Sequence, residues 1–153
     1  MNSNGGIRRV RGNMKIILAA DGSKYTARAV KYLVTHLATL GANPEIGLLY
    51  VQQPIPGRAA AAVSRSVLRR YYNEESRKAL TPAARVLKAR GIRFEEIHLV
   101  GDPGTSIAAY AERKKCSLII MGSHGRGAVS SFVLGSVVRK VLASCSIPVL
   151  IVR

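Results

Sequence analysis

Residues 119–127, with the sequence IIMGSHGRG, and residues 134–137, with the sequence LGSV, are the stretch from which the fold follows. An apolar run ends abruptly at Gly122, a polar loop follows, and Gly135-Ser136 opens a segment of helical spacing. A short, continuously apolar run is typical of a strand that is buried on both faces. The stretch therefore predicts a buried strand, then a glycine-rich turn, then a helix.

The same succession of apolar run, turn and helical pattern occurs along the rest of the chain. Strands are predicted over residues 15–20, 46–51, 93–100, 118–121 and 147–152. Residues 93–100 alternate partly between polar and apolar side chains, which predicts a strand near an edge of the sheet. Five strands that alternate with helices predict an α/β fold, in which a parallel sheet carries helices on both faces. Ligands of such folds bind beyond the carboxyl ends of the strands.

Capping residues and a proline indicate the boundaries of two of the predicted helices. Ser23 is a good N-cap for the first helix, and Gly41 is a good C-cap for it. Residues 64–90 have a strongly basic helical pattern that contains Pro82. Two interpretations remain open: one helix that kinks at Pro82, or a second helix with Thr81 as its cap and Pro82 in its first position.

The composition is that of one globular domain with an excess of positive charge. The chain has 153 residues, of which 48% are hydrophobic, and a net charge of +16 at pH 7. We assign residues 14–153 to one domain and residues 1–13, rich in Gly, Asn and Arg, to a flexible basic tail. The charge favours anionic partners. The basic residues are nevertheless spread along the chain, so no specific nucleic-acid partner is expected.

The sequence also bears on where the protein is located and on whether it has a metal site. No apolar run approaches the ~20 residues that span a bilayer, so no membrane partner is expected. The apolar run at residues 15–20 is too short for a signal peptide, which predicts a cytoplasmic protein. Cys116 and Cys145 fit no zinc signature, so no metal-ligating residues are predicted.

The glycine-rich stretch has the chemistry of an anion site. Gly122 and Gly125 allow the backbone to approach a ligand closely, with N–H groups that can form a nest. Gly135-Ser136 at a helix start offers unpaired N–H donors, the positive end of the helix dipole and a hydroxyl. Arg139 and Lys140 add positive charge nearby. The stretch is neither a Walker A loop nor the dinucleotide fingerprint. A tight structural turn followed by a serine-capped helix remains the alternative.

At this point the sequence resembles a known family. The spacing Gly122-x2-Gly125-x9-Gly135-Ser136, together with residues 21–23, 101–103 and 147–152, is similar to the signature of small single-domain universal stress proteins. The resemblance covers residues 14–153. It implies a three-layer, doubly wound five-stranded parallel sheet in the order 3-2-1-4-5, of the adenine nucleotide alpha hydrolase-like type. It also implies a homodimer in which the C-terminal edge strands pair, which would cover an exposed apolar edge.

The resemblance further implies an ATP site, with or without Mg²⁺, and a regulatory role in the stress response. Asp21 would bind adenine or ribose, Val51 would offer backbone contacts to adenine, and Met121 would lie against the nucleoside. Backbone N–H groups of the loop and of the helix start would hold the phosphates; they belong to Gly122, His124, Gly125, Gly135, Ser136 and Val137. Ala19 departs from the family pattern, because ATP-binding members often carry proline there.

Three competing interpretations concern catalysis and binding. His124 could act as a base if Ser123 or Ser136 and Asp21 lie near it, although its side chain could equally point to solvent. A second interpretation is a nucleotidyl-transfer enzyme related to the ATP pyrophosphatases, although the chain lacks the Ser-Gly-Gly-x-Asp motif of those enzymes. A dimer that binds no nucleotide is the third interpretation. Because no carboxylate cluster or obvious general base is present, ATP hydrolysis is expected to be slow or absent.

Overall fold

The computed structural model describes residues 13–40, 43–127 and 133–153. In chain order the elements are β1 (Lys15–Ala19), α1 (Lys24–His36), the short 3₁₀ helix η1 (Leu37–Thr39), β2 (Glu45–Gln52), α2 (Gly57–Ala61), α3 (Arg65–Ala89), β3 (Glu95–Val100), α4 (Pro103–Arg113), β4 (Leu118–Gly122), α5 (Ser136–Ser144) and β5 (Val149–Val152). Of the predicted tail, residues 1–12 lie outside the described ranges, as does the predicted C-cap Gly41.

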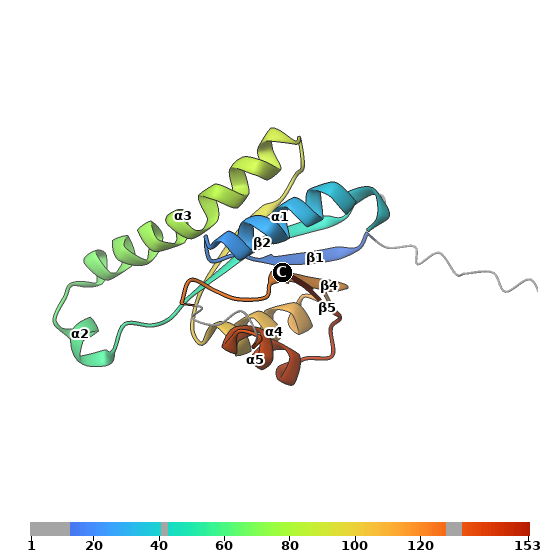
Figure 1. The fold of residues 1–153 in the computed structure, drawn as a ribbon. Helices are drawn as coiled ribbons and strands as arrows, with labels where there is room; N and C mark the ends of the chain where they lie inside the picture. Colours follow the sequence, from blue (N-terminus) through green and yellow to red (C-terminus); the bar gives the residue numbers. More distant parts are fainter. Residues whose placement is uncertain (1–12, 41–42, 128–132) are drawn as a thin grey trace, which may run out of the picture.

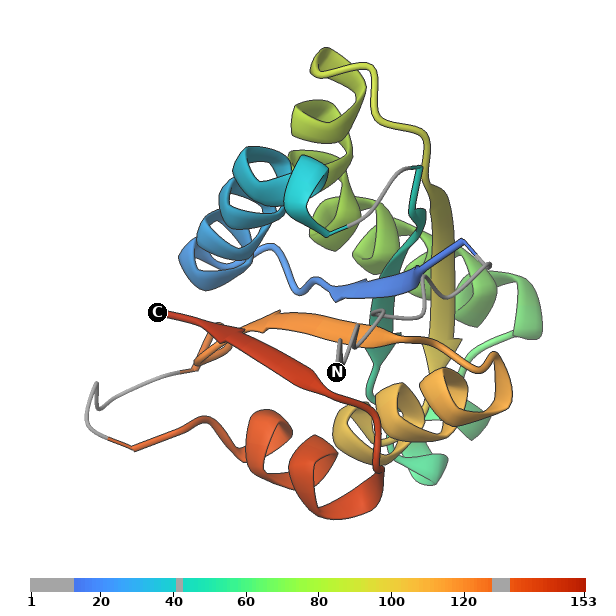
Figure 2. The same cartoon turned by 90° about the vertical axis from the view of Figure 1, so that its right-hand side faces the viewer.

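The five strands form one parallel sheet in the order β3-β2-β1-β4-β5. The predicted order and fold class are therefore confirmed, and β3 lies at an edge as its partial alternation indicates. Helices α1 and α3 cover one face of the sheet, and α4 and α5 cover the other (Figures 1 and 2). None of the described helices is both long and apolar enough to cross a membrane.

Alternation along the strands builds a core on each face of the sheet. Ile16 and Leu18 of β1 are fully buried against α1 and α3, whereas Ile17 and Ala19 point to the α4 and α5 side. Successive side chains of a strand point to opposite faces, so a strand in the middle of three layers must be apolar throughout. The continuous apolar runs of the sequence thus become the central strands.

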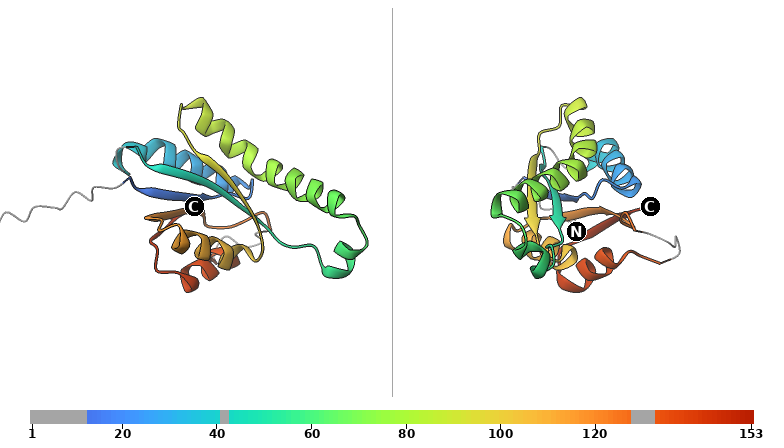
Figure 3. Two further views of the ribbon diagram at one scale, coloured as in Figure 1. Left: turned by 180° about the vertical axis from the view of Figure 1, so that it is seen from behind. Right: turned by 90° about the vertical axis from the view of Figure 1, so that its left-hand side faces the viewer.

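Helix α3 runs through Pro82 without a break, so the one-helix interpretation is the correct one. Pro82 and Lys78, whose carbonyl loses its helical donor, are both exposed, and water can take the place of the missing bond. Gly91 ends the helix with a positive φ of 67°. The amides of Gly91 and Ile92 donate to the carbonyls of Lys88 and Leu87 in a Schellman motif. The first half of α3, together with α2, projects beyond the sheet (Figure 3).

Candidate functional site

The site begins at the carboxyl end of β1, where Asp21 joins the strand to α1. Asp21 Oδ1 accepts hydrogen bonds from the Ser23 amide at 2.9 Å and from the Thr26 hydroxyl at 2.8 Å. The Thr26 hydroxyl also accepts from the Asp21 amide. Ser23 is the predicted N-cap, and its hydroxyl accepts from the Thr26 amide at 3.2 Å. The Asp21 carboxylate is therefore held in a fixed direction by local backbone and side-chain bonds.

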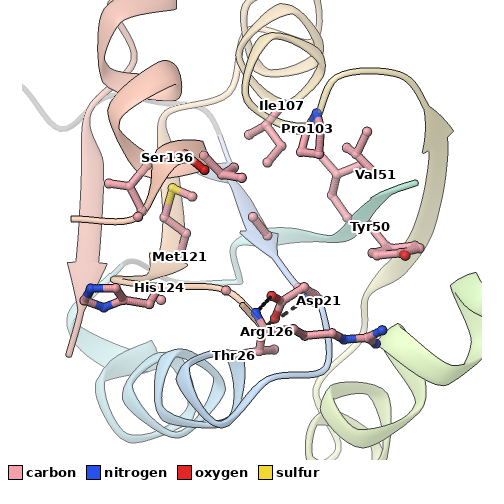
Figure 4. Close-up of a pocket in the computed structure, with 18 of the residues that line it drawn as sticks. Asp21, Thr26, Tyr50, Val51, Pro103, Ile107, Met121, His124, Arg126 and Ser136 are labelled. Carbon is pink, nitrogen blue, oxygen red and sulfur yellow. Dashed lines mark hydrogen bonds between the residues drawn. The ribbon is translucent and has the colours of Figure 1, made fainter. Parts of the chain in front are cut away.

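The loop after β4 is tied to the same carboxylate. Asp21 Oδ2 accepts from the amide of Arg126 at 3.1 Å (Figure 4). A Cβ added to Gly125 would lie 2.9 Å from this oxygen, so the loop can approach only because Gly125 has no side chain. Strands β1 and β4 are neighbours in the sheet, which brings the two segments together. One carboxylate thus joins two of the predicted site segments.

Gly122 has a packing role that the sequence did not indicate. A Cβ on Gly122 would lie 2.6 Å from Tyr25 Cβ and 2.8 Å from the Tyr25 carbonyl carbon. The missing side chain lets the first turn of α1 pack directly on the end of β4. A bulky residue at this position would disturb α1 as well as any ligand.

His124 is fastened to its own loop by both ring nitrogens. Nδ1 lies 2.9 Å from the hydroxyl of Ser123, and Nε2 is bonded to the carbonyl of Val133. Since a carbonyl can only accept, Nε2 carries the proton in its bond to Val133. The ring also contacts the ring of Tyr25, with centroids 5.1 Å apart. The side chain therefore points neither freely to solvent nor at Asp21, and it closes the loop.

The first turn of α5 forms the opposite wall of the site. The Gly135 amide donates to the carbonyl of Ser123 at 2.9 Å, and a Cβ on Gly135 would lie 3.1 Å from the same oxygen. Gly135 occupies the N-cap position and offers no side chain to cap the helix. The first amides of a helix have no partner within it, so those at Ser136 and Val137 are available to an anion.

These segments enclose one cavity of about 370 Å³ at the carboxyl ends of the strands. All ten residues that the sequence singles out line it: Ala19, Asp21, Val51, Met121, Gly122, His124, Gly125, Gly135, Ser136 and Val137. Val51, Pro103 and Ile107 form an apolar side, whereas Asp21, Thr26 and Arg126 lie on a polar side (Figure 4). The size falls within the usual range for small-molecule sites.

Several lining residues were missed by the sequence analysis: Thr26, Tyr50, Pro103, Ile107, Arg126 and Val138. Pro103 follows the turn after β3, and Tyr50 precedes the predicted Val51. The rule that strand ends converge could have found both. Which way the Arg126 side chain turns depends on three-dimensional packing and left no sequence signal.

The guanidinium of Arg126 extends from the loop toward α3 (Figure 4). Its Nη2 lies 2.9 Å from the place of a Cβ on Gly22, which has a positive φ of 77°, and Ala79 Cα of α3 lies 3.3 Å from that place. Burial raises the pKa of the Tyr50 phenol, and the positive charge of Arg126 opposes this shift. Arg126 thus places a cation between the polar side of the cavity and α3.

Lys140 does not lie where the sequence analysis placed it. Its Nζ donates to Asp102 Oδ2 at 2.8 Å, and its stem packs where a Cβ on Gly104 would be. Asp102 also caps α4 by accepting from the Thr105 amide. These bonds, that from Lys140 foremost, lower the pKa of Asp102 to about 2. Lys140 therefore fastens α5 to α4, which supply one side of the cavity, and does not reach into it.

Comparison with protein families matches residues 12–153 to the universal stress protein family. The chain belongs to this family. Among universal stress proteins, YxiE of Bacillus subtilis is 32% identical over 152 residues, covering 91% of this chain and 98% of its own. MJ0531 of Methanocaldococcus jannaschii is 30% identical over 141 residues, covering 91% of this chain and 81% of its own.

Solved structures of universal stress proteins share the fold. The structure of MJ0577, a protein of Methanocaldococcus jannaschii, superposes with a TM-score of 0.72 at 27% identity, over 91% of this chain and 94% of that one. A universal stress protein in complex with cAMP gives a TM-score of 0.66 at 23% identity, over 92% and 97% of the chains. One from Archaeoglobus fulgidus in complex with dAMP gives 0.63 at 21% identity, over 92% and 98%.

Proposed function

We propose that this universal stress protein binds ATP in the cavity between the ends of β1 and β4 and acts as a regulatory module in a stress response. One observation carries the proposal. The carboxylate of Asp21, the residues Gly122 and Gly125 that allow the backbone to approach a ligand closely, and the first turn of α5, which no side chain caps, all lie around one cavity. Family members solved with cAMP and dAMP support an adenine nucleotide as the ligand class.

The two sides of the cavity suit the two ends of a nucleotide. Val51, on the apolar side, and Met121 would hold the adenine, and the free lone pairs of Asp21 would accept from the ribose or the base. The amides of Gly125, Ser136 and Val137 would donate to phosphate oxygens, and the α5 dipole favours negative charge there. Arg126 would add a positive charge at the polar side.

The side chains that line the cavity favour binding of ATP over its hydrolysis. Among the described lining residues Asp21 is the only carboxylate, and no described cluster of three His, Cys, Asp or Glu could hold a metal. A Mg²⁺ that arrives with ATP would therefore be held chiefly by phosphates and water. His124 is occupied at both nitrogens and would need to release Val133 or Ser123 before it could serve as a base. Slow or absent hydrolysis is the expectation.

Thermal shift with ATP, ADP, AMP and GTP tests the ligand class. Binding to the folded state raises the melting temperature by mass action, so ATP at millimolar concentration should give a clear upward shift and GTP a smaller one. No shift with any adenine nucleotide would contradict the proposal and favour a dimer that binds no nucleotide. Release of pyrophosphate from ATP would instead favour a nucleotidyl-transfer enzyme.

Strand β5 also supports a homodimer as part of the proposal. It lies at the sheet edge, with apolar residues that are only partly buried. Pairing with a second copy would satisfy its outer backbone groups and cover these side chains. The cytoplasmic location stays a prediction of the sequence.

A further inference from the structure

The positive charge of the chain gathers on one layer of the fold. Helices α1 and α3 together carry ten Lys and Arg residues and two Glu residues, a net charge of +8 and half of the +16 of the chain. Helices α4 and α5, on the other side of the sheet, carry three Lys and Arg residues and one Glu, a net charge of +2. The even spread that the sequence suggests therefore becomes a marked asymmetry once the chain is folded.

The cations of α1 lie directly opposite its buried stripe. Lys24, Arg28 and Lys31 are spaced four and three residues apart and are all exposed. The buried residues of the helix are Thr26, Ala29, Val30 and Leu33. At 3.6 residues per turn these sets occupy opposite faces, and the three cations span about 10 Å along the helix.

Helix α3 continues this positive surface beside α1. Lys78 and Arg85, seven residues apart, are exposed on the side of α3 away from its buried residues. The two helices pack against each other (Figures 1 and 3). We call Lys24, Arg28, Lys31, Lys78 and Arg85 the basic face.

Most of this charge is not neutralised within the protein. In the described part of the chain, Lys78 is the one cation of α1 and α3 with a carboxylate within 4 Å, that of Glu75. Lys24 and Arg28 lie over the ring of Tyr25, at 5.2 and 5.5 Å from its centroid, which restrains both side chains near the surface. The members of the basic face do not line the described cavity, so its charge is not there to hold the nucleotide.

We propose that the basic face binds double-stranded nucleic acid through its phosphates, without regard to sequence. A surface with five exposed cations, of which only Lys78 has a carboxylate partner among the described residues, suits a duplex, which carries one negative charge per about 1.7 Å of its axis. A membrane surface fits less well, because interfacial helices insert an apolar face. The outer ridge of α1 has no large apolar side chain, and the exposed ones of α3 in the described residues are Val67, Tyr71 and Val86.

Fluorescence anisotropy with a labelled duplex of about 20 base pairs, titrated at several salt concentrations, tests the proposal. The test variant is Arg28→Glu/Lys31→Glu/Arg85→Glu. Its matched control, Arg113→Glu/Lys114→Glu/Arg139→Glu, makes the same change in net charge at exposed positions on the α4 and α5 side. The neutral set Arg28→Gln/Lys31→Gln/Arg85→Gln guards against a folding defect caused by charge reversal.

The unaltered protein should bind the duplex and a scrambled duplex equally, with affinity that falls steeply with salt. The test variant should bind the duplex at least about tenfold more weakly. For the neutral set, the slope of the logarithm of the association constant against the logarithm of the salt concentration should become shallower by about 2 to 3, roughly one for each lost phosphate contact. The control should keep most of the binding. Equal losses in test and control would overturn the proposal, as would tighter binding to phosphatidylserine vesicles than to the duplex.

Discussion

Asp21 holds the candidate site together through each of its carboxylate oxygens. Oδ1 accepts hydrogen bonds from Ser23 and Thr26 at the start of α1, and Oδ2 accepts one from the Arg126 amide in the loop after β4. The resemblance to the family implied only a contact to the nucleotide. In the structure the same group also joins two segments that are 105 residues apart.

Substitutions at Asp21 should separate the contribution of its Oδ1 bonds to stability from that of its Oδ2 bond. Asp21→Asn keeps an acceptor at Oδ1 but turns an amide nitrogen toward the Arg126 N–H, so it should cost about 1 kcal/mol of unfolding free energy. Asp21→Ala removes every acceptor and should cost about 2 to 3 kcal/mol. Denaturant unfolding measures both values. Equal losses in the two variants would show that the Oδ1 bonds to the start of α1 carry no separate weight.

Gly22 is a position where the backbone itself requires glycine. Its φ is +77°, and a Cβ would meet both Arg126 Nη2 and the α3 backbone at Ala79. Gly22→Ala should therefore destabilise the protein by roughly 1–2 kcal/mol from the left-handed backbone alone. Gly127→Ala is the matched control, because a Cβ at Gly127 would meet nothing within 4 Å. Denaturant midpoints that shift equally in both variants would refute this explanation.

At the scale of elements, the strands could be predicted well and the side-chain contacts poorly. Apolar runs bounded by polar and turn residues place β1, β2 and β4 within about one residue, because burial on both faces leaves no other pattern. β5 begins at Val149 and not at residue 147, since Pro148 cannot donate to the ladder. The pairing of Lys140 with Asp102 could not be foreseen, because it joins two helices whose packing only the fold determines.

The bond between Lys140 and Asp102 should leave a signature in the pH dependence of stability. The pKa of Asp102 is about 2 in the folded state against 3.8 for the free side chain, so its contribution is fully present above about pH 4 and is lost as the pH falls toward 2. In Lys140→Met this part of the acid destabilisation should shrink. Melting curves from pH 2 to 5 measure it, and high salt should weaken the difference because the pair is exposed. Parallel acid profiles for both proteins would exclude such a contribution.

For the whole molecule, the sheet order determines where a ligand can bind. Because β1 lies between β2 and β4, the ends carrying Asp21, Val51 and Gly122 meet at one edge, and the cavity opens there. The order 3-2-1-4-5, which the family resemblance implied, makes the first and fourth strands neighbours. The asymmetry of charge between the two helical layers, in contrast, requires knowledge of which helices share a face.

The exposed edge at β5 leads to a prediction about assembly. Val152→Lys should place a charge on this edge and convert a dimer to monomers, because lysine on an edge strand opposes pairing. Light scattering after size exclusion measures the molar mass. Lys31→Glu, on the outer ridge of α1, is the control and should leave the dimer intact. A monomeric unaltered protein at all concentrations would contradict the proposed homodimer.

Calorimetric titration of Ser136→Asp with adenosine, AMP and ATP tests the proposed nucleotide site most directly. Ser136 is exposed at the first position of α5, where an aspartate suits the helix dipole and should leave the fold intact. If the start of α5 holds phosphates, the aspartate should weaken ATP binding at least about tenfold, because repulsion between two like charges at short range costs more than about 1.4 kcal/mol. Adenosine has no phosphate, so its binding should be unchanged. Ser136→Asn should retain most of the affinity for ATP. An unchanged affinity for ATP in Ser136→Asp, or an equal loss for adenosine, would contradict the account.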